Sequence, residues 1–181
     1  MINAANLITI SRIILILPVL MLVSEEKNLL NWFALTLFVL AGITDHLDGY
    51  VARKTGTESS LGALLDLMAD KLLIVLTISY LVSFTINKYL VIPAMIIISR
   101  ELVISAFRQF LTERKGSNPL QVSFIAKSKT TLQIIAVSFL IISPNFGDNF
   151  YVLTIILFYF AAVASLYSLY GYLKNYKNYI K

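Results

Sequence analysis

The chain has 181 residues, of which 58% are apolar and 14% charged, and its formal net charge is +5. A soluble domain usually carries about 25% charged residues. This composition, with a mean hydropathy of +0.79, therefore excludes an ordinary soluble protein and indicates an integral membrane protein. The absence of cysteine excludes disulfides and thiolate metal sites, and the single histidine excludes a histidine-rich zinc site. The length fits one membrane domain, residues 1–181, and we expect no nucleic-acid partner.

Six apolar segments follow one another along the chain, separated by polar residues. Most of them approach the roughly 20 residues that a helix needs to cross a hydrocarbon core about 30 Å thick. The segments are 7–23, 29–44, 61–84, 89–110, 130–143 and 151–173. They predict an all-α integral membrane protein with six transmembrane helices. The first segment is expected to be a retained helix rather than a signal peptide, because its start is neutral and Arg12 interrupts it.

Basic residues are divided unevenly between the two alternating sets of connections. One set holds only Lys27 and Lys88. The other set, together with the C-terminal tail, holds Arg53, Lys54, Arg114, Lys115, Lys127, Lys129, Lys174, Lys177 and Lys181. Because lysine and arginine concentrate in cytoplasmic loops, this distribution predicts that both termini face the cytoplasm. Loops are predicted on that side at 52–60 and 111–128.

Four aspartates lie between residues 45 and 70. Asp45 and Asp48 are three residues apart, and Asp66 and Asp70 are four apart, so each pair shares one face of a helix. A charged side chain at mid-bilayer costs about 2.5–3.5 kcal/mol, so the two aspartates inside the third apolar segment are expected to have a function. Four carboxylates brought together repel one another unless cations separate them, and an all-oxygen ligand set suits Mg²⁺ or Mn²⁺.

Nearby residues indicate what such a metal site would act on. A pair of divalent ions can bridge and neutralise a diphosphate while a hydroxyl attacks it. Arg53 can add a forked contact to the phosphates, and Gly49 and Gly62 allow a nucleotide to approach the backbone closely. The residues alone therefore predict metal-dependent chemistry on a phosphorylated substrate at the cytoplasmic surface of the membrane.

This motif resembles, position for position, the signature of the CDP-alcohol phosphatidyltransferases. In this sequence it reads Asp45-x2-Asp48-Gly49-x2-Ala52-Arg53-x8-Gly62-x3-Asp66-x3-Asp70. Flanking segments resemble the bacterial phosphatidylglycerophosphate synthases of that family, at residues 6–12, 69–71, 99–108 and 127–133. The resemblance covers essentially the whole chain. It implies a six-helix membrane fold in a bacterial cytoplasmic membrane, with the active site facing the cytoplasm.

The resemblance also implies roles for individual residues. Asp45, Asp48, Asp66 and Asp70 would bind two Mg²⁺ or Mn²⁺ ions, and Asp70 would also be the general base. The CDP group would be held by Asn6, Thr9, Asp48, Gly49, Ala52, Arg53, Ser59 and Gly62. The implied reaction is attack by the free primary hydroxyl of glycerol 3-phosphate on the β-phosphorus of CDP-diacylglycerol. It releases CMP and forms phosphatidylglycerophosphate, a step in phospholipid biosynthesis.

The acceptor is the part of this interpretation with the most alternatives. Its own phosphate needs cations, for which the candidates are Arg100, Arg108, Lys127 and Lys129. Arg100 can equally well form a structural pair with Glu101. Another acceptor used within the family, namely inositol phosphate, serine or phosphatidylglycerol, stays open. A divalent-cation transporter also stays open, although transporters more often carry two related halves. Membrane lipids are expected partners, and the sequence leaves a homodimer open.

Overall fold

The protein is represented by a computed structural model. It describes the backbone of residues 4–24, 26–55, 60–85, 87–115 and 124–180. Within these ranges it describes the side chains of residues 10–24, 26–44, 68–69, 71–85, 87–107, 110 and 130–174. The described backbone is entirely helical apart from its connections, as predicted. Its elements are α1 Ala4–Leu22, α2 Leu29–Thr55, α3 Ser60–Thr85, α4 Lys88–Lys115, α5 Phe124–Ile142, the 3₁₀ helix η1 Ser143–Asn145, and α6 Asp148–Ile180.

The helices extend beyond the apolar segments that predicted them. α2 continues through residues 45–53 and ends at Thr55, so residues 52–55 are helical where a loop was predicted. α4 continues to Lys115 and α5 begins at Phe124, which shortens the connection predicted at 111–128 from both sides. Alanine, arginine, lysine and glutamate favour helices. The end of an apolar run therefore marks the end of lipid-compatible composition and not the end of the helix.

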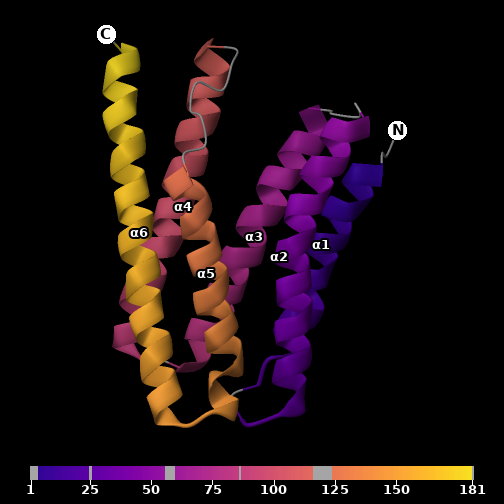
Figure 1. Cartoon of the computed structure of the whole chain (residues 1–181), viewed down its shortest axis with the longest axis vertical. Helices are drawn as coiled ribbons and strands as arrows, with labels where there is room; N and C mark the ends of the chain where they lie inside the picture. Colours follow the sequence, from indigo (N-terminus) through magenta and orange to yellow (C-terminus); the bar gives the residue numbers. More distant parts are fainter. Residues whose placement is uncertain (1–3, 25, 56–59, 86, 116–123, 181) are drawn as a thin grey trace.

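The six helices run alternately up and down in one bundle (Figure 1). α1 packs against α2 and α3, while α4 and α5 both pack against α6. The two groups meet where α5 contacts α2 and α3, and where α3 contacts α4. The start of α1 and the end of α6 lie at one end of the bundle, and the end of α2 and the start of α3 lie at that same end (Figure 1).

One face of α1 enters the core. Ile16 and Val19 are buried three residues apart, Arg12 shares their face and is 0% exposed, and Val23 is buried directly after the helix ends. Because this face packs against α2 and α3, the Arg12 side chain lies inside the bundle. The core continues through the other helices with Phe38, Ile78, Ile97, Ile141 and Phe158.

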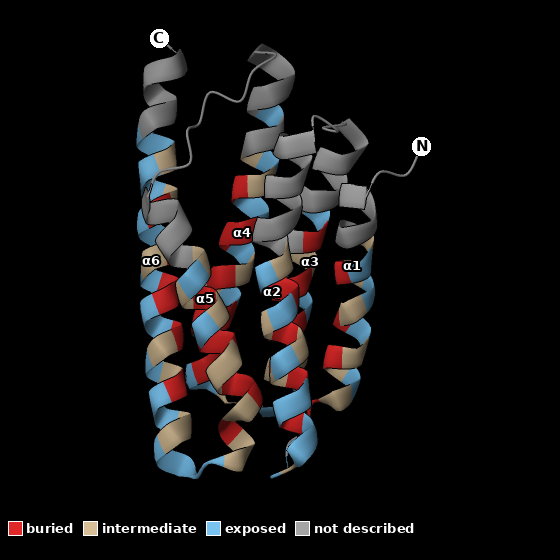
Figure 2. Cartoon of the chain, turned by 45° about the vertical axis from the view of Figure 1, so that its right-hand side comes forward, coloured by how far each residue is buried: buried red, intermediate tan, exposed pale blue. Residues whose placement is uncertain are grey.

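Among the described residues, two helices contain segments that are long and apolar enough to cross a membrane, Lys88–Phe107 in α4 and Asp148–Lys174 in α6. Many large apolar side chains point outward, among them Met21 and Phe160, and Figure 2 shows exposed residues along the outside of the bundle. Such an apolar surface marks contact with lipid or protein. Six membrane-spanning helices and termini on the cytoplasmic side therefore stay predictions. The remaining apolar stretches of the described residues are shorter: Ile10–Leu22, Leu29–Thr44, Lys71–Thr85 and Thr130–Asn145.

Asparagines tie the α1–α2 connection to the turn between α5 and α6. Fully buried Asn31 donates from Nδ2 to Asn145 Oδ1 over 2.9 Å. Asn145 also accepts from the Asn28 amide at 3.1 Å and donates to the Asn28 carbonyl at 3.0 Å. Asn31 in turn accepts from the Ser24 amide at 2.8 Å and donates to the Glu26 carbonyl at 3.0 Å. This amide network closes the end of the bundle opposite the aspartate motif.

We expect Asn145→Ala to destabilise the protein, because it removes both side-chain contacts to the Asn28 backbone. Leaving part-buried polar groups without these partners costs about 1–3 kcal/mol. The measurement is the apparent melting temperature of the purified protein in detergent. Asn149→Ala is the matched control, since Asn149 is exposed and four residues further along the chain. Equal melting temperatures for the two variants would contradict a structural role for the Asn145 contacts.

Candidate functional site

The two halves of the aspartate motif lie on neighbouring helix ends. Asp45 and Asp48 lie on the last turns of α2, and Asp66 and Asp70 lie on the first turns of α3. The end of α2 and the start of α3 lie together at one end of the bundle (Figure 1). The backbone therefore brings both halves of the motif to the same end. The four carboxylates themselves lie outside the described side chains, so their convergence on a metal stays a prediction.

For most of the residues predicted to bind the CDP group and the acceptor, the structure likewise describes the backbone but not the side chain. For the CDP group, the structure places Asn6 and Thr9 on the first turns of α1 and Gly49, Ala52, Arg53 and Gly62 on α2 and α3. For the acceptor, it places Arg108 on α4 and Lys127 and Lys129 on α5. None of these side chains is described, and Ser59 lies outside the described backbone. Their roles stay predictions.

A buried ionic cluster begins one residue after Asp70. Lys71 Nζ donates a hydrogen bond to Glu101 Oε2, which joins α3 to α4. Glu101 Oε1 accepts from Arg100 NH1 at 3.1 Å and from Gln133 Nε2 at 3.2 Å. The side chain of Glu101 is 4% exposed and that of Lys71 is 20% exposed. One carboxylate thus receives donors from three helices, α3, α4 and α5.

Arg100 extends this cluster to α6. Its Nε donates to the Ser165 carbonyl at 3.1 Å, and its NH2 donates to Ser168 Oγ at 2.8 Å. The guanidinium also lies 5.9 Å from the ring centroid of Tyr172, within cation–π range. Gln133 Nε2 donates to Ser165 Oγ at 3.0 Å. We call Lys71, Arg100, Glu101, Gln133, Ser165 and Ser168 the Glu101 cluster.

Buried charges are stable only when they are paired and hydrogen-bonded. Glu101 and Arg100 are both buried, and each is hydrogen-bonded to the other as well as to partners on other helices. The structural pairing that the sequence left open for Arg100 is therefore present. Its predicted contact with the acceptor phosphate stays untested. The sequence did not predict the contacts of Glu101 with Lys71 and Gln133. The available signal was that each of these polar residues interrupts an apolar segment.

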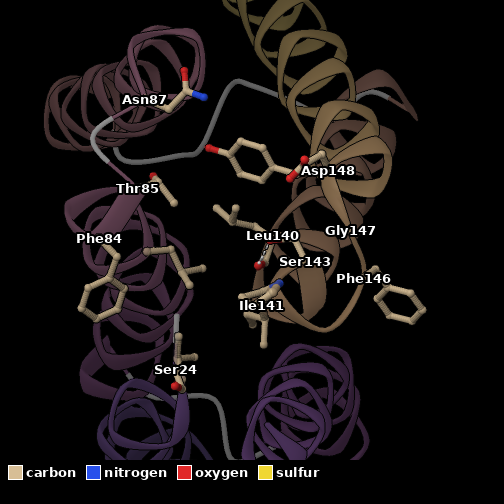
Figure 3. A pocket seen from close by; sticks show the side chains of 14 residues that line it. Ser24, Phe84, Thr85, Asn87, Leu140, Ile141, Ser143, Phe146, Gly147 and Asp148 are labelled. Atoms are coloured by element: carbon tan, nitrogen blue, oxygen red, sulfur yellow. Dashed lines mark hydrogen bonds between the residues drawn. The ribbon is translucent and has the colours of Figure 1, made fainter. Parts of the chain in front are cut away.

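A separate pocket of about 360 Å³ lies at the opposite end of the bundle (Figure 3). Its walls come from the end of α3, the turn between α5 and α6, and the residues that follow α1. Its polar lining includes Ser24, Thr85, Asn87, Ser143 and Asp148. No lysine or arginine is among the described residues that line it, and Asp148 repels anions. This pocket is therefore unsuited to a phosphorylated substrate, and the candidate site is the motif end of the bundle.

Similarity to known proteins extends over almost the whole chain. The chain is 37% identical over 180 residues to the CDP-diacylglycerol--glycerol-3-phosphate 3-phosphatidyltransferase of Rickettsia typhi, covering 98% of each chain. It is 36% identical over 172 residues to the protein of the same name from Escherichia coli K12, covering 94% of this chain and 93% of that one. A protein of that name from Cereibacter sphaeroides is 40% identical over 116 residues, 64% of this chain and 52% of that protein.

Residues 2–167 match the family described as CDP-alcohol phosphatidyltransferase. The matched range contains the complete aspartate motif on α2 and α3 and the whole Glu101 cluster except Ser168. A match over this length, together with relatives similar from end to end, confirms the resemblance read from the motif. The chain belongs to the CDP-alcohol phosphatidyltransferase family.

Proposed function

We propose that this protein transfers the phosphatidyl group of CDP-diacylglycerol to glycerol 3-phosphate, giving phosphatidylglycerophosphate and CMP. The observation that carries this proposal is the similarity, over 94–98% of the chain, to bacterial proteins named for that reaction. Family membership also favours group transfer over the divalent-cation transport that the sequence left open. The family and the two long apolar helices indicate a membrane protein.

We further propose six transmembrane helices, with both termini and the active site on the cytoplasmic side of a bacterial cytoplasmic membrane. Six helices running alternately up and down return the chain to the end where it started, which supports termini on one side. Most of the basic residues outside the apolar segments belong to the connections and the tail at that end of the bundle. This agrees with the tendency of cytoplasmic loops to be basic.

Divalent ions fit the residues at this end. Asp45 and Asp48 on α2, with Asp66 and Asp70 on α3, supply only oxygen donors, the ligands that Mg²⁺ and Mn²⁺ prefer. Two such ions, when bound, would neutralise the charge that develops on the diphosphate. Arg53, on the last turns of α2, would add two parallel hydrogen bonds to a phosphate. Gly49 and Gly62 would let the nucleotide approach the two helices closely.

The residues of the chain would then handle the proton and the acceptor. Asp70 would accept the proton of the acceptor's primary hydroxyl while the hydroxyl oxygen forms a bond to the β-phosphorus. The bond from that phosphorus to the CMP oxygen breaks, and CMP leaves with the electron pair. The acceptor phosphate carries about two negative charges, so it needs cations apart from the carboxylates. The candidates for these cations are Arg108 on α4 and Lys127 and Lys129 on α5.

We expect Asp66→Asn to abolish CMP release while the protein still inserts and folds, because the amide cannot replace a negatively charged ligand. The measurement is CMP release at saturating Mg²⁺. Asp148→Asn is the matched control, since Asp148 begins α6 at the opposite end of the bundle, and it should retain wild-type activity. An Asp66→Asn protein with more than about a tenth of wild-type activity would argue against the two-metal site. Its activation free energy would have risen by less than about 1.4 kcal/mol.

A second pair of variants separates the general base from a simple ligand. Asp48→Asn removes a metal contact, whereas Asp70→Asn removes both a contact and the proton acceptor. Raising the Mn²⁺ concentration should partly restore Asp48→Asn and leave Asp70→Asn inactive. Activity is measured for both proteins over the same range of Mn²⁺. Equal recovery would show that Asp70 is only a ligand.

The acceptor site is tested with Arg108→Ala. Loss of one charge-assisted hydrogen bond to the phosphate costs about 1.5–3 kcal/mol, so the KM for glycerol 3-phosphate should rise about tenfold or more. The KM for CDP-diacylglycerol should change little. Arg114→Ala, on the same helix, is the control. Parallel changes in both KM values, or none, would remove Arg108 from the acceptor site and favour a role at the lipid headgroups.

A further inference from the structure

The Glu101 cluster lies next to the half of the motif that α3 carries. Lys71 follows Asp70 directly, and it lies three residues after Met68 and five after Asp66. Its ammonium group donates to a carboxylate from the neighbouring helix α4. A contact between helices at this position restrains both the rotation of α3 about its axis and its position along that axis. Those two quantities set where α3 presents Asp66 and Asp70.

Glu101 is itself fixed from the other side. Its second oxygen accepts from Arg100, whose Nε and NH2 are bonded to α6 at 3.1 and 2.8 Å. Gln133 on α5 bonds the same oxygen at 3.2 Å and also reaches Ser165 on α6. The Glu101 carboxylate on α4 is thus connected by hydrogen bonds to α5 and, through Arg100, to α6. Its contact with Lys71 connects this group of helices to α3.

We propose that Glu101 is a positioning residue for the metal site, which holds α3 through Lys71 so that Asp66 and Asp70 face the carboxylates of α2. This inference rests on the proposed function only for the identity of the site. Glu101 does not touch the substrate or the metals; it acts through the helix that carries their ligands. Groups that orient metal ligands from behind typically change metal affinity or activity by about 10–100-fold when they are removed.

The charge of Glu101 is the property that matters for this role. Glutamine has nearly the same shape but no charge, so Glu101→Gln removes an anion that both Lys71 and the buried Arg100 contact. Breaking such a pair from one side is costly because a desolvated charge remains. Lys71, the more exposed of the two cations, can leave the cluster toward solvent. α3 would then lose its contact with α4 at this turn.

The first measurement is direct Mn²⁺ binding, read from the loss of the spectrum of free Mn²⁺ in electron paramagnetic resonance. We expect Glu101→Gln to raise the Mn²⁺ dissociation constant about tenfold or more. Glu101→Asp, which keeps the charge but shortens the side chain, should recover part of the affinity. The matched control is Asn145→Ala, which breaks a hydrogen-bonded network between helix connections at the opposite end. It should lower the melting temperature and leave Mn²⁺ binding unchanged.

The second measurement reports the position of α3 without using metal or substrate. The chain contains no cysteine, so spin labels can be placed at chosen positions without background. Met68 on α3 and Leu102 on α4 are exposed neighbours of the cluster. The distance between labels at Met68→Cys and Leu102→Cys should be narrowly distributed in the wild-type background and in Asn145→Ala. In Glu101→Gln it should broaden or shift.

The proposal requires both changes in Glu101→Gln. An unchanged Mn²⁺ affinity would show that the cluster only stabilises the fold. An unchanged label distance with weaker Mn²⁺ binding would show that Glu101 acts otherwise than through α3. Either result overturns the proposal. A wild-type protein that binds Mn²⁺ but transfers nothing to glycerol 3-phosphate would instead overturn the proposed function, since neither measurement depends on activity.

Discussion

The described part of this bundle depends on one constraint, that charge buried among apolar helices must be paired. Glu101 is the point where this constraint is met. A carboxylate has about four acceptor positions, and here three donors from α3, α4 and α5 occupy its two oxygens. Since Arg100 carries the contacts on to α6, a single anion links four of the six helices of the described backbone.

The two ends of the bundle are tied by different chemistry. The end opposite the motif is closed by the neutral amides of Asn31 and Asn145, bonded to each other and to the backbone. Neutral contacts of this kind add no net charge and attract no ion. The Glu101 cluster, by contrast, holds two cations for one anion among its described side chains. The charged cluster thus lies toward the end where the phosphates would bind, and the neutral network lies at the other end.

The sequence predicted the fold class and the helix count, because a long apolar run has few other stable forms. It failed at boundaries such as 52–55, where polar residues continue a helix that hydropathy ends early. The motif could be recognised because its members are local in sequence, and the metal site inferred from it stays a prediction. The Glu101 cluster could not be found in this way. Its helices contribute residues 71, 101, 133 and 165, each about thirty residues from the next. Local spacing cannot identify partners at that distance, although the cost of each polar residue in an apolar segment shows that one must exist.

The proposed metal site adds a second reason for this anchoring. In that site four carboxylates facing one another would repel before any cation arrives, and the repulsion would push α2 and α3 apart. α2 packs against α1 and α5, while α3 packs against α1, α4 and α5, so each helix of the motif has partners besides the other. The ionic contact from α4 acts on α3 at Lys71, one residue from Asp70. A site that must remain open and negatively charged until metal binds needs support from behind, and in the described residues the Glu101 cluster is placed to give it.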